Sequence, residues 1–239
     1  MQDNGVFEQD SPAAEVMNSR IIEVVGRDIV TGVLAPGTRL TLVGLQEQFG
    51  VSRTVVRDCM QILEAMNLVY SKRRIGIVVL EPQRWNVYDP RIIRWRLAGP
   101  GRSSQFRSLT ELRIAVEPLA AAGAARAASE EQRRSLQDLA ERMRRDAHDP
   151  EAFLAADIAF HTLLLQASGN EMFASLREVF AEVLSGRSRQ NLMPEGPRPE
   201  ALELHAGVAE AVGREDPAAA RAQMAELLVE VEEAIRLHG

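Results

Sequence analysis

Four ionisable residues in the second half of the chain fall on otherwise apolar helical faces: Arg113, Asp157, His161 and His205. Such side chains are costly to bury unless they are paired or bind a metal ion. Asp157 and His161 stand one helical turn apart, so both can reach one ion. A histidine from another helix would complete an N,N,O donor set, which is typical of zinc, nickel and manganese sites. These residues are therefore candidates for a divalent metal site.

Each of these residues also has a structural interpretation. A single histidine on an apolar face is more often a core or surface residue with its hydrogen bonds made than a metal ligand. Arg113 could simply pair with Glu117, one turn later on the same helix. From the residues alone, both interpretations stay open.

A second group of residues, in the first half of the chain, has the chemistry for binding DNA. On a helix that begins after Ser52, apolar residues share one face, while Arg53, Thr54 and Arg57 fall largely on the other. Arginine can bind guanine through two hydrogen bonds, and serine or threonine can hold phosphates at a helix N-terminus. The alternative is that this face is merely solvated.

The charge distribution supports a local DNA-binding surface. The chain has 28 basic and 34 acidic residues, a net charge of -6, which argues against a globally basic surface. Residues 36–76 nevertheless carry six basic and three acidic groups, a net charge of +3. Any contact with nucleic acid is therefore expected in this segment.

The elements that must position these residues follow in the order of a winged helix-turn-helix. Beyond Pro82 the apolar pattern is helical to the end of the chain. The expected helices cover 12–31, 42–48, 52–67, 89–98, 105–127, 130–147, 150–168, 170–189, 199–213 and 217–237, with a β-hairpin formed by 68–72 and 75–80.

This order predicts a mainly α fold with an N-terminal winged helix-turn-helix and a C-terminal all-helical bundle. The length of 239 residues allows at most two ordinary domains. With a lone Cys59, no secretory signal and no long apolar segment, we expect a cytoplasmic protein without a membrane partner. The expected divisions are a disordered arm at 1–12, a DNA-binding domain at 13–81, a linker with a short helix at 82–104 and a helical effector-binding domain at 105–239.

The run from Phe49 to Asp58, followed by Leu63, Leu68 and Val69, resembles the GntR family of bacterial transcription regulators. That resemblance implies double-stranded operator DNA as a partner. Because one recognition helix reads only a few base pairs, we expect a homodimer on a palindromic operator. The DNA contacts implied by the resemblance are those of Ser52, Arg53, Thr54 and Arg57, assisted by the hairpin residues Arg73, Arg74 and Gly76.

From about Arg107 onward the chain is similar to the FCD-type effector domain of one large GntR subfamily. The similarity covers Leu112-Arg113, Glu117-Pro118, Asp157, His161, Gly169-Asn170, His205 and Asp216-Pro217. It implies that Asp157, His161 and His205 hold a divalent metal ion, zinc first with nickel or manganese as alternatives, and that Arg113 helps bind a carboxylate effector.

The position of a further metal-binding histidine of that domain falls at Leu227, so three protein ligands remain. Two outcomes stay open. Either water or effector fills the open positions of the ion, or the metal site has weakened and the polar cluster binds the ligand directly.

The segment that joins the two halves has a narrower resemblance. Its residues Trp85, Asn86, Asp89, Ile93, Trp95 and Leu97 are similar to the linker of galactonate-type repressors, which control sugar-acid catabolism. We therefore expect a repressor that a sugar acid releases from its operator. The alternatives are control of another small-carboxylate pathway and a metal-dependent hydrolase or isomerase. A P-loop, a nucleophile elbow and a clear general base are all missing, so we do not expect an enzyme.

Overall fold

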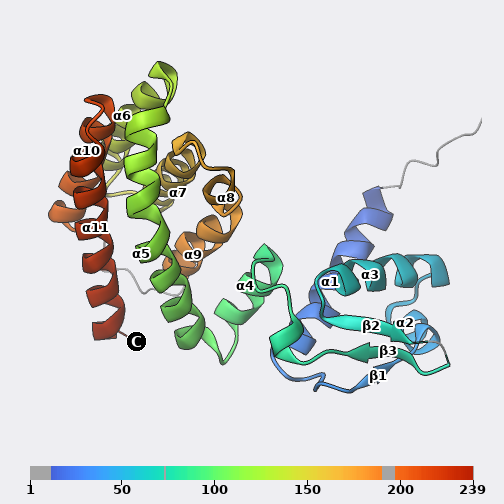
Figure 1. Cartoon of the computed structure of the whole chain (residues 1–239). Helices are drawn as coiled ribbons and strands as arrows, with labels where there is room; N and C mark the ends of the chain where they lie inside the picture. The colour runs from blue at the N-terminus through green and yellow to red at the C-terminus, as the bar shows by residue number, and fades with distance from the viewer. Residues whose placement is uncertain (1–11, 73, 190–196, 239) are drawn as a thin grey trace, which may run out of the picture. The chain divides into compact units, whose positions relative to one another are not determined.

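The computed structural model describes residues 12–72, 74–189 and 197–238, and the chain divides into two compact units at residues 1–99 and 100–239 (Figure 1). The predicted disordered arm therefore lies outside the described residues, except for Pro12, which begins the first helix. Among the described helices, none is long and apolar enough to cross a bilayer.

The first unit contains a helix-turn-helix followed by a β-hairpin, as the sequence predicts. The Thr41 hydroxyl caps the second helix by accepting from Gly44 N at 3.0 Å, and Gly50 ends that helix with a φ of 66°. The elements are α1 (Pro12–Val30), β1 (Arg39–Leu40), α2 (Leu42–Phe49), α3 (Arg53–Ala65), β2 (Val69–Lys72), β3 (Gly76–Val79), the 3-10 helix η1 (Pro82–Arg84) and α4 (Pro90–Ala98).

The sheet of this unit has three antiparallel strands in the order β1-β3-β2. Lys72 pairs with Gly76 at the tip of the predicted hairpin, and Arg39 pairs with Val78 on the other side of β3. The sequence did not predict β1, because two residues are too few to show an alternating pattern and its pairing depends on a distant strand.

Helices α1 and α3 pack together on one face of this sheet (Figure 1). Their apolar faces form a core with Ile21, Val56 and Leu63, all completely buried, and with Leu68 at the start of the hairpin. The expected division of α3 into a buried face and an exposed face is therefore confirmed.

Helix α4, predicted as a linker helix, packs against α1 within the first unit. Asp89 caps it by accepting from Arg91 N at 2.9 Å, and Ile92 and Trp95 belong to the core of that unit. The Trp95 indole donates to Glu23 Oε1 at 2.6 Å, and its ring lies so close to Gly26 that an added Cβ would meet it at 2.2 Å. The tryptophan therefore fixes α4 to α1.

The second unit is entirely helical in its described parts. One expected helix, 170–189, is instead two, and the break follows Ser175, whose hydroxyl donates back to Met172 O at 2.8 Å. The helices are α5 (Arg102–Ala127), α6 (Glu130–Arg145), α7 (Pro150–Ala167), α8 (Glu171–Ala174), α9 (Arg177–Arg189), α10 (Pro199–Gly213) and α11 (Pro217–His238).

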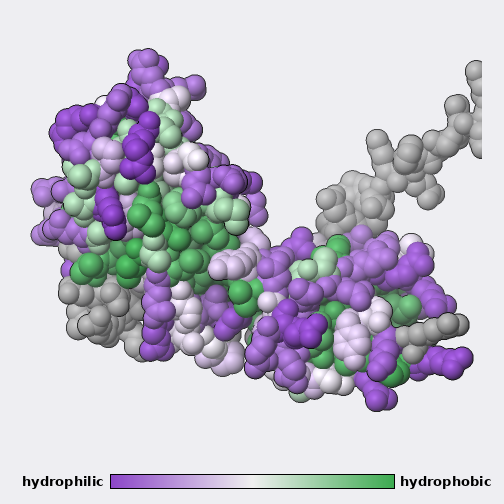
Figure 2. Space-filling view, viewed as in Figure 1, coloured by the Kyte–Doolittle hydropathy of each residue, from purple (hydrophilic) through white to green (hydrophobic). Residues whose placement is uncertain are grey.

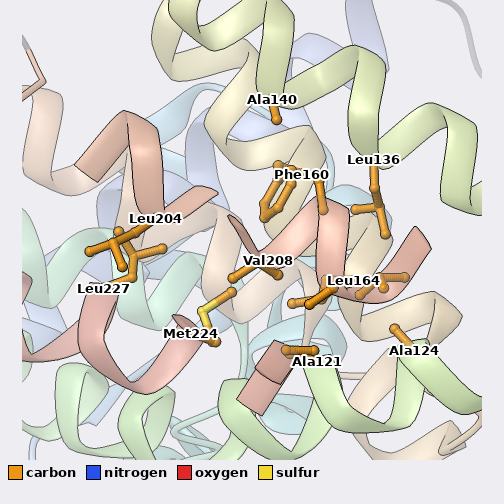
Figure 3. Close-up of a cluster of buried hydrophobic side chains, with 14 of the residues drawn as sticks. Ala121, Ala124, Leu136, Ala140, Phe160, Leu164, Leu204, Val208, Met224 and Leu227 are labelled. Atoms are coloured by element: carbon orange, nitrogen blue, oxygen red, sulfur yellow. The ribbon is translucent and has the colours of Figure 1, made fainter. Parts of the chain in front are cut away.

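Helices α5 and α11 lie side by side in opposite directions along the bundle (Figure 1). The core between the helices includes Leu136, Phe160, Val208 and Met224, all with no exposed surface (Figure 3). Phe160 of this core contacts the rings of His161 and His205, two of the predicted metal ligands.

Candidate functional site

The exposed face of α3 presents the residues predicted to contact DNA. Ser52, Arg53, Thr54 and Arg57 are all exposed at or near the N-terminus of the helix. The Ser52 hydroxyl also caps α3 by accepting from Val55 N at 3.4 Å. The helix N-terminus and two arginines thus face solvent together, which suits contact with phosphates and base edges.

The hairpin tip places Arg74 on the surface with a φ of 67°. Arg73, predicted to assist there, lies outside the described residues. The position of Gly76 requires glycine, because its φ is 103° and an added Cβ would lie 2.7 Å from Leu40 O. The glycine therefore lets the start of β3 approach β1 closely.

A cluster of five ionisable side chains is buried in the second unit. Among the described residues, the buried arginine, carboxylate and histidine side chains all belong to it. Each is at most 6% exposed, and they come from α5, α7 and α10: Arg113, Glu117, Asp157, His161 and His205. We call this set the buried polar cluster.

Local features of α5 and α7 bring the cluster together. Asp149 caps α7 by accepting from Glu151 N and Ala152 N, each at 3.1 Å, and Pro150 follows at the first helical position. Farther along α7, Ser168 O lies 2.4 Å from where a Cβ on Gly123 would be. A glycine at this point of α5 therefore permits the close approach of the two helices.

Arg113 is paired with Glu117, as its structural interpretation predicts, but the pair leaves part of the guanidinium free. Arg113 Nε donates to Glu117 Oε1 at 2.6 Å, and Nη2 donates to Oε2 at 3.3 Å. Nη2 also lies 3.4 Å from His161 Nε2. The buried Nη1 atom has no hydrogen-bond partner among the described residues. An unpaired buried donor of this kind suits an anionic ligand.

Asp157, His161 and His205 place three donor atoms at the corners of a nearly equilateral triangle. Asp157 Oδ1 lies 3.3 Å from His161 Nε2 and 3.2 Å from His205 Nε2, and the two nitrogens are 3.3 Å apart. Ligands bound to one zinc ion at about 2.0 to 2.1 Å stand about 2.9 to 3.4 Å apart. The three atoms therefore fit one divalent ion, and in the described part of the chain they form the group with metal-ligand spacing.

The electrostatics of the cluster keep both of its carboxylates ionised. Burial by itself raises the pKa of Glu117, but Arg113 and His161 outweigh it and hold that pKa at about 2. Burial likewise raises the pKa of Asp157, yet hydrogen bonds from His161 and His205 keep it well below its usual range. For His161, burial lowers the pKa, and the neighbouring Glu117 charge more than compensates and raises it. Each carboxylate thus has its own partners: Arg113 and His161 for Glu117, and His161 and His205 for Asp157.

Leu227 is part of the apolar core, as its place in the sequence pattern predicts. It is 2% exposed and lies in the same buried cluster as Leu204 and Met224 (Figure 3). A metal ion held by the three donor atoms therefore receives no ligand from this position, and its remaining positions are open to water or to a bound molecule.

The structure brings together every residue predicted for the metal and effector sites. The role that sequence reasoning missed is that of Glu117, which was considered only as a partner for Arg113. Its Oε2 atom also lies 2.8 Å from His161 Nδ1. The spacing of Arg113 and Glu117 could have indicated the pair, but the contact with His161 depends on the packing of α5 against α7.

A winged helix-turn-helix with an exposed recognition helix, joined to a helical unit with a buried polar cluster, defines a DNA-binding transcription regulator. Two family models match the chain: "Bacterial regulatory proteins, gntR family" over residues 18–79 and "FCD domain" over residues 108–230. The chain belongs to the GntR family and carries an FCD domain. It is thus a regulator rather than an enzyme.

Named relatives and solved structures agree with this assignment. The chain is 29% identical to the galactonate operon transcriptional repressor of Escherichia coli K12, over 84% of this chain and 89% of the relative. It is 31% identical to the HTH-type transcriptional regulator LutR of Bacillus subtilis, over 68% and 73% of the two chains. The solved structure of E. coli McbR/YncC matches with a TM-score of 0.53 at 18% identity, covering 93% and 98%, which supports the fold.

The Arg113–Glu117 pair makes a direct prediction about stability. Replacing the arginine, Arg113→Ala, should lower the free energy of unfolding by about 3 to 5 kcal/mol, because the buried Glu117 carboxylate loses its arginine partner and both hydrogen bonds from it. Urea unfolding followed by circular dichroism measures this loss. The matched control is Arg107→Ala on the exposed face of α5, for which we expect a change of less than about 0.5 kcal/mol. Equal stability of the two variants would contradict the pairing.

Proposed function

We propose that this protein is a repressor of sugar-acid catabolism, released from a palindromic operator when a galactonate-like sugar acid binds the buried polar cluster. The observation that carries the proposal is the geometry of that cluster. It combines three donor atoms spaced for one divalent ion with an arginine whose Nη1 is buried and unpaired. The likeness to a galactonate operon repressor over 84% of the chain supports the choice of ligand class.

The DNA side of the proposal rests on α3 and the hairpin. Ser52, Arg53, Thr54 and Arg57 contact the operator, and the hairpin around Arg73, Arg74 and Gly76 assists. One recognition helix reads only a few base pairs, so a homodimer on two related half-sites supplies the specificity. Figure 2 shows hydrophobic residues gathered over the middle of the helical unit, a surface that suits contact with a second copy.

In the helical unit, Asp157, His161 and His205 hold a divalent ion, with zinc favoured by the two nitrogens and one carboxylate. The ion supplies positive charge and open coordination positions for oxygen ligands. The donor atoms fit this role because each histidine has its Nδ1 beside an acceptor. His205 Nδ1 lies 2.6 Å from Ala201 O, and His161 Nδ1 lies 2.8 Å from Glu117 Oε2. In each ring, Nε2 is then the nitrogen that faces the other ligands.

The effector is a monocarboxylate that carries a neighbouring hydroxyl group. Arg113, Glu117 and Asp157 together have a charge of -1, and a divalent ion changes this to +1. A monoanion then neutralises the buried site, whereas a dicarboxylate leaves excess negative charge in a buried environment. A sugar acid can place its carboxylate near Arg113 Nη1 and offer carboxylate and hydroxyl oxygens to the metal.

Release from DNA follows from linkage. An effector that binds the DNA-incompetent arrangement more tightly shifts the population away from the operator, and only by as much as the two affinities differ. The buried polar cluster supplies the effector-binding energy, and the exposed face of α3 supplies the operator-binding energy.

The first prediction of this proposal concerns operator binding. Arg57→Ala should weaken binding to an operator by about 1 to 3 kcal/mol, because it removes a base contact from the exposed face of α3. Fluorescence anisotropy at fixed salt measures the loss, with Arg221→Ala on the surface of α11 as the control. If Arg53→Ala and Arg57→Ala both bound like the parent, α3 would not be the recognition helix.

The second prediction concerns metal content. Protein purified without chelator should contain about one divalent ion per chain, and His161→Ala or His205→Ala should lose it, since two protein ligands retain an ion poorly. Elemental analysis measures the content, and His148→Ala, which changes an exposed histidine, is the control. A parent without metal that still binds effector after chelation would favour direct recognition by the polar cluster.

The third prediction tests the effector response. Arg113→Lys keeps a positive charge beside Glu117 but lacks Nη1, so the protein should stay folded and operator-bound while its affinity for D-galactonate falls by about 1.5 to 3 kcal/mol. Operator release by D-galactonate, compared with Arg107→Lys on the exposed face of α5, measures the loss. Release at the parent's ligand concentration would remove Arg113 from the effector site. A parent that does not respond to any of a panel of aldonic and uronic acids would contradict the ligand class.

A further inference from the structure

The carboxylate of Glu117 contacts two other side chains of the buried polar cluster, Arg113 and His161. Glu117 itself is not a predicted metal ligand, and a carboxylate does not bind an anion. It has no exposed surface. Its Oε1 accepts from Arg113 Nε at 2.6 Å. Its Oε2 lies 3.3 Å from Arg113 Nη2 and 2.8 Å from His161 Nδ1. One side chain of α5 therefore contacts both the proposed effector-binding arginine and a proposed metal ligand of α7.

The approach of Glu117 Oε2 to His161 Nδ1, at 2.8 Å but without hydrogen-bond geometry in this structure, favours one ring nitrogen over the other for binding an ion. A carboxylate beside Nδ1 favours a proton on that nitrogen, so a neutral ring then has its lone pair on Nε2. That Nε2 atom lies 3.3 Å from both Asp157 Oδ1 and His205 Nε2. Glu117 thus orients the imidazole toward the other two donors, and its charge makes the ring a stronger ligand.

The contact with Arg113 decides which edge of the guanidinium can bind a ligand. Glu117 occupies Nε and one side of Nη2, and Nη1 stays unpaired. A planar guanidinium held along one edge cannot rotate freely, so its Nη1 donors have a fixed direction. The same carboxylate therefore orients the group that recognises the effector.

We propose that Glu117 is a positioning residue that couples metal binding to effector binding by holding His161 through one contact and Arg113 through the others. This inference rests on the proposed function of the cluster and adds a regulatory element to it. Because coupling between two binding sites is reciprocal, metal should tighten effector binding and effector should tighten metal binding by the same factor.

The experiment uses Glu117→Gln in the chain of 239 residues, with Glu111→Gln on the exposed side of α5 as the matched control. The amide keeps the size of the side chain but removes its charge and half of its acceptor capacity. Competition with a chromophoric chelator should show that Glu117→Gln binds zinc about 10- to 100-fold more weakly than the parent. Glu111→Gln should bind zinc like the parent.

Calorimetry with D-galactonate then measures the coupling. In the parent, saturating zinc should strengthen D-galactonate binding by about 5- to 150-fold. In Glu117→Gln this strengthening should be smaller than in the parent and fall toward the part that direct contact between effector and ion supplies, while Glu111→Gln keeps the parental value. A purely structural role for Glu117 predicts a lower melting temperature with parental zinc affinity and parental coupling, and that result would overturn the inference.

A measurement on the parent alone keeps the inference testable if Glu117→Gln does not fold. In zinc-loaded protein, nitrogen NMR should find the metal on His161 Nε2 and a proton on Nδ1. Zinc bound through Nδ1 would overturn the inference. If the parent binds no zinc, the metal half of the proposed function fails together with the inference. If the parent binds zinc and Glu117→Gln binds it equally well, the inference alone fails.

Discussion

The buried carboxylate of Glu117, held between Arg113 and His161, is the interaction on which the helical unit depends. Ionised groups lose their hydration when they are buried, and only pairing, hydrogen bonds or a bound ion can offset that cost. Arg113 compensates one carboxylate, but Asp157 is ionised as well. Hydrogen bonds from His161 and His205 hold Asp157 ionised, and the donor atoms of these three side chains have the spacing of ligands for one divalent ion.

The packing of the bundle follows from the need to bring these groups together. Gly123 lets α5 approach the end of α7, so that Glu117 reaches His161. Leu227 is buried in the apolar core, so it adds no donor atom to the group formed by Asp157, His161 and His205. The first unit is organised separately, around the core beneath α3, and Trp95 fixes α4 to α1 through Glu23. Regulation requires only that effector binding and DNA binding favour different arrangements of the two units.

Sequence patterns predicted the features that depend on local or periodic signals. The exposed arginines of α3, the hairpin and the helices of the bundle follow from such signals, and polar residues on apolar faces indicated the side chains that meet in the buried polar cluster. The sequence could not predict the two-residue strand β1 or the break after Ser175, which depend on distant pairing and on one side-chain hydrogen bond. It also left Arg113 with two competing roles. Pairing with Glu117 uses only part of the guanidinium, so the pairing does not exclude contact with an anion.

The most direct test is a crystal structure of the zinc-loaded protein with D-galactonate, with anomalous diffraction recorded at the zinc edge. The account predicts one anomalous peak bonded to Asp157, His161 and His205, with oxygens of the sugar acid on the ion and its carboxylate at Arg113 Nη1. Zinc bound elsewhere, or D-galactonate bound away from this cluster, would contradict the account.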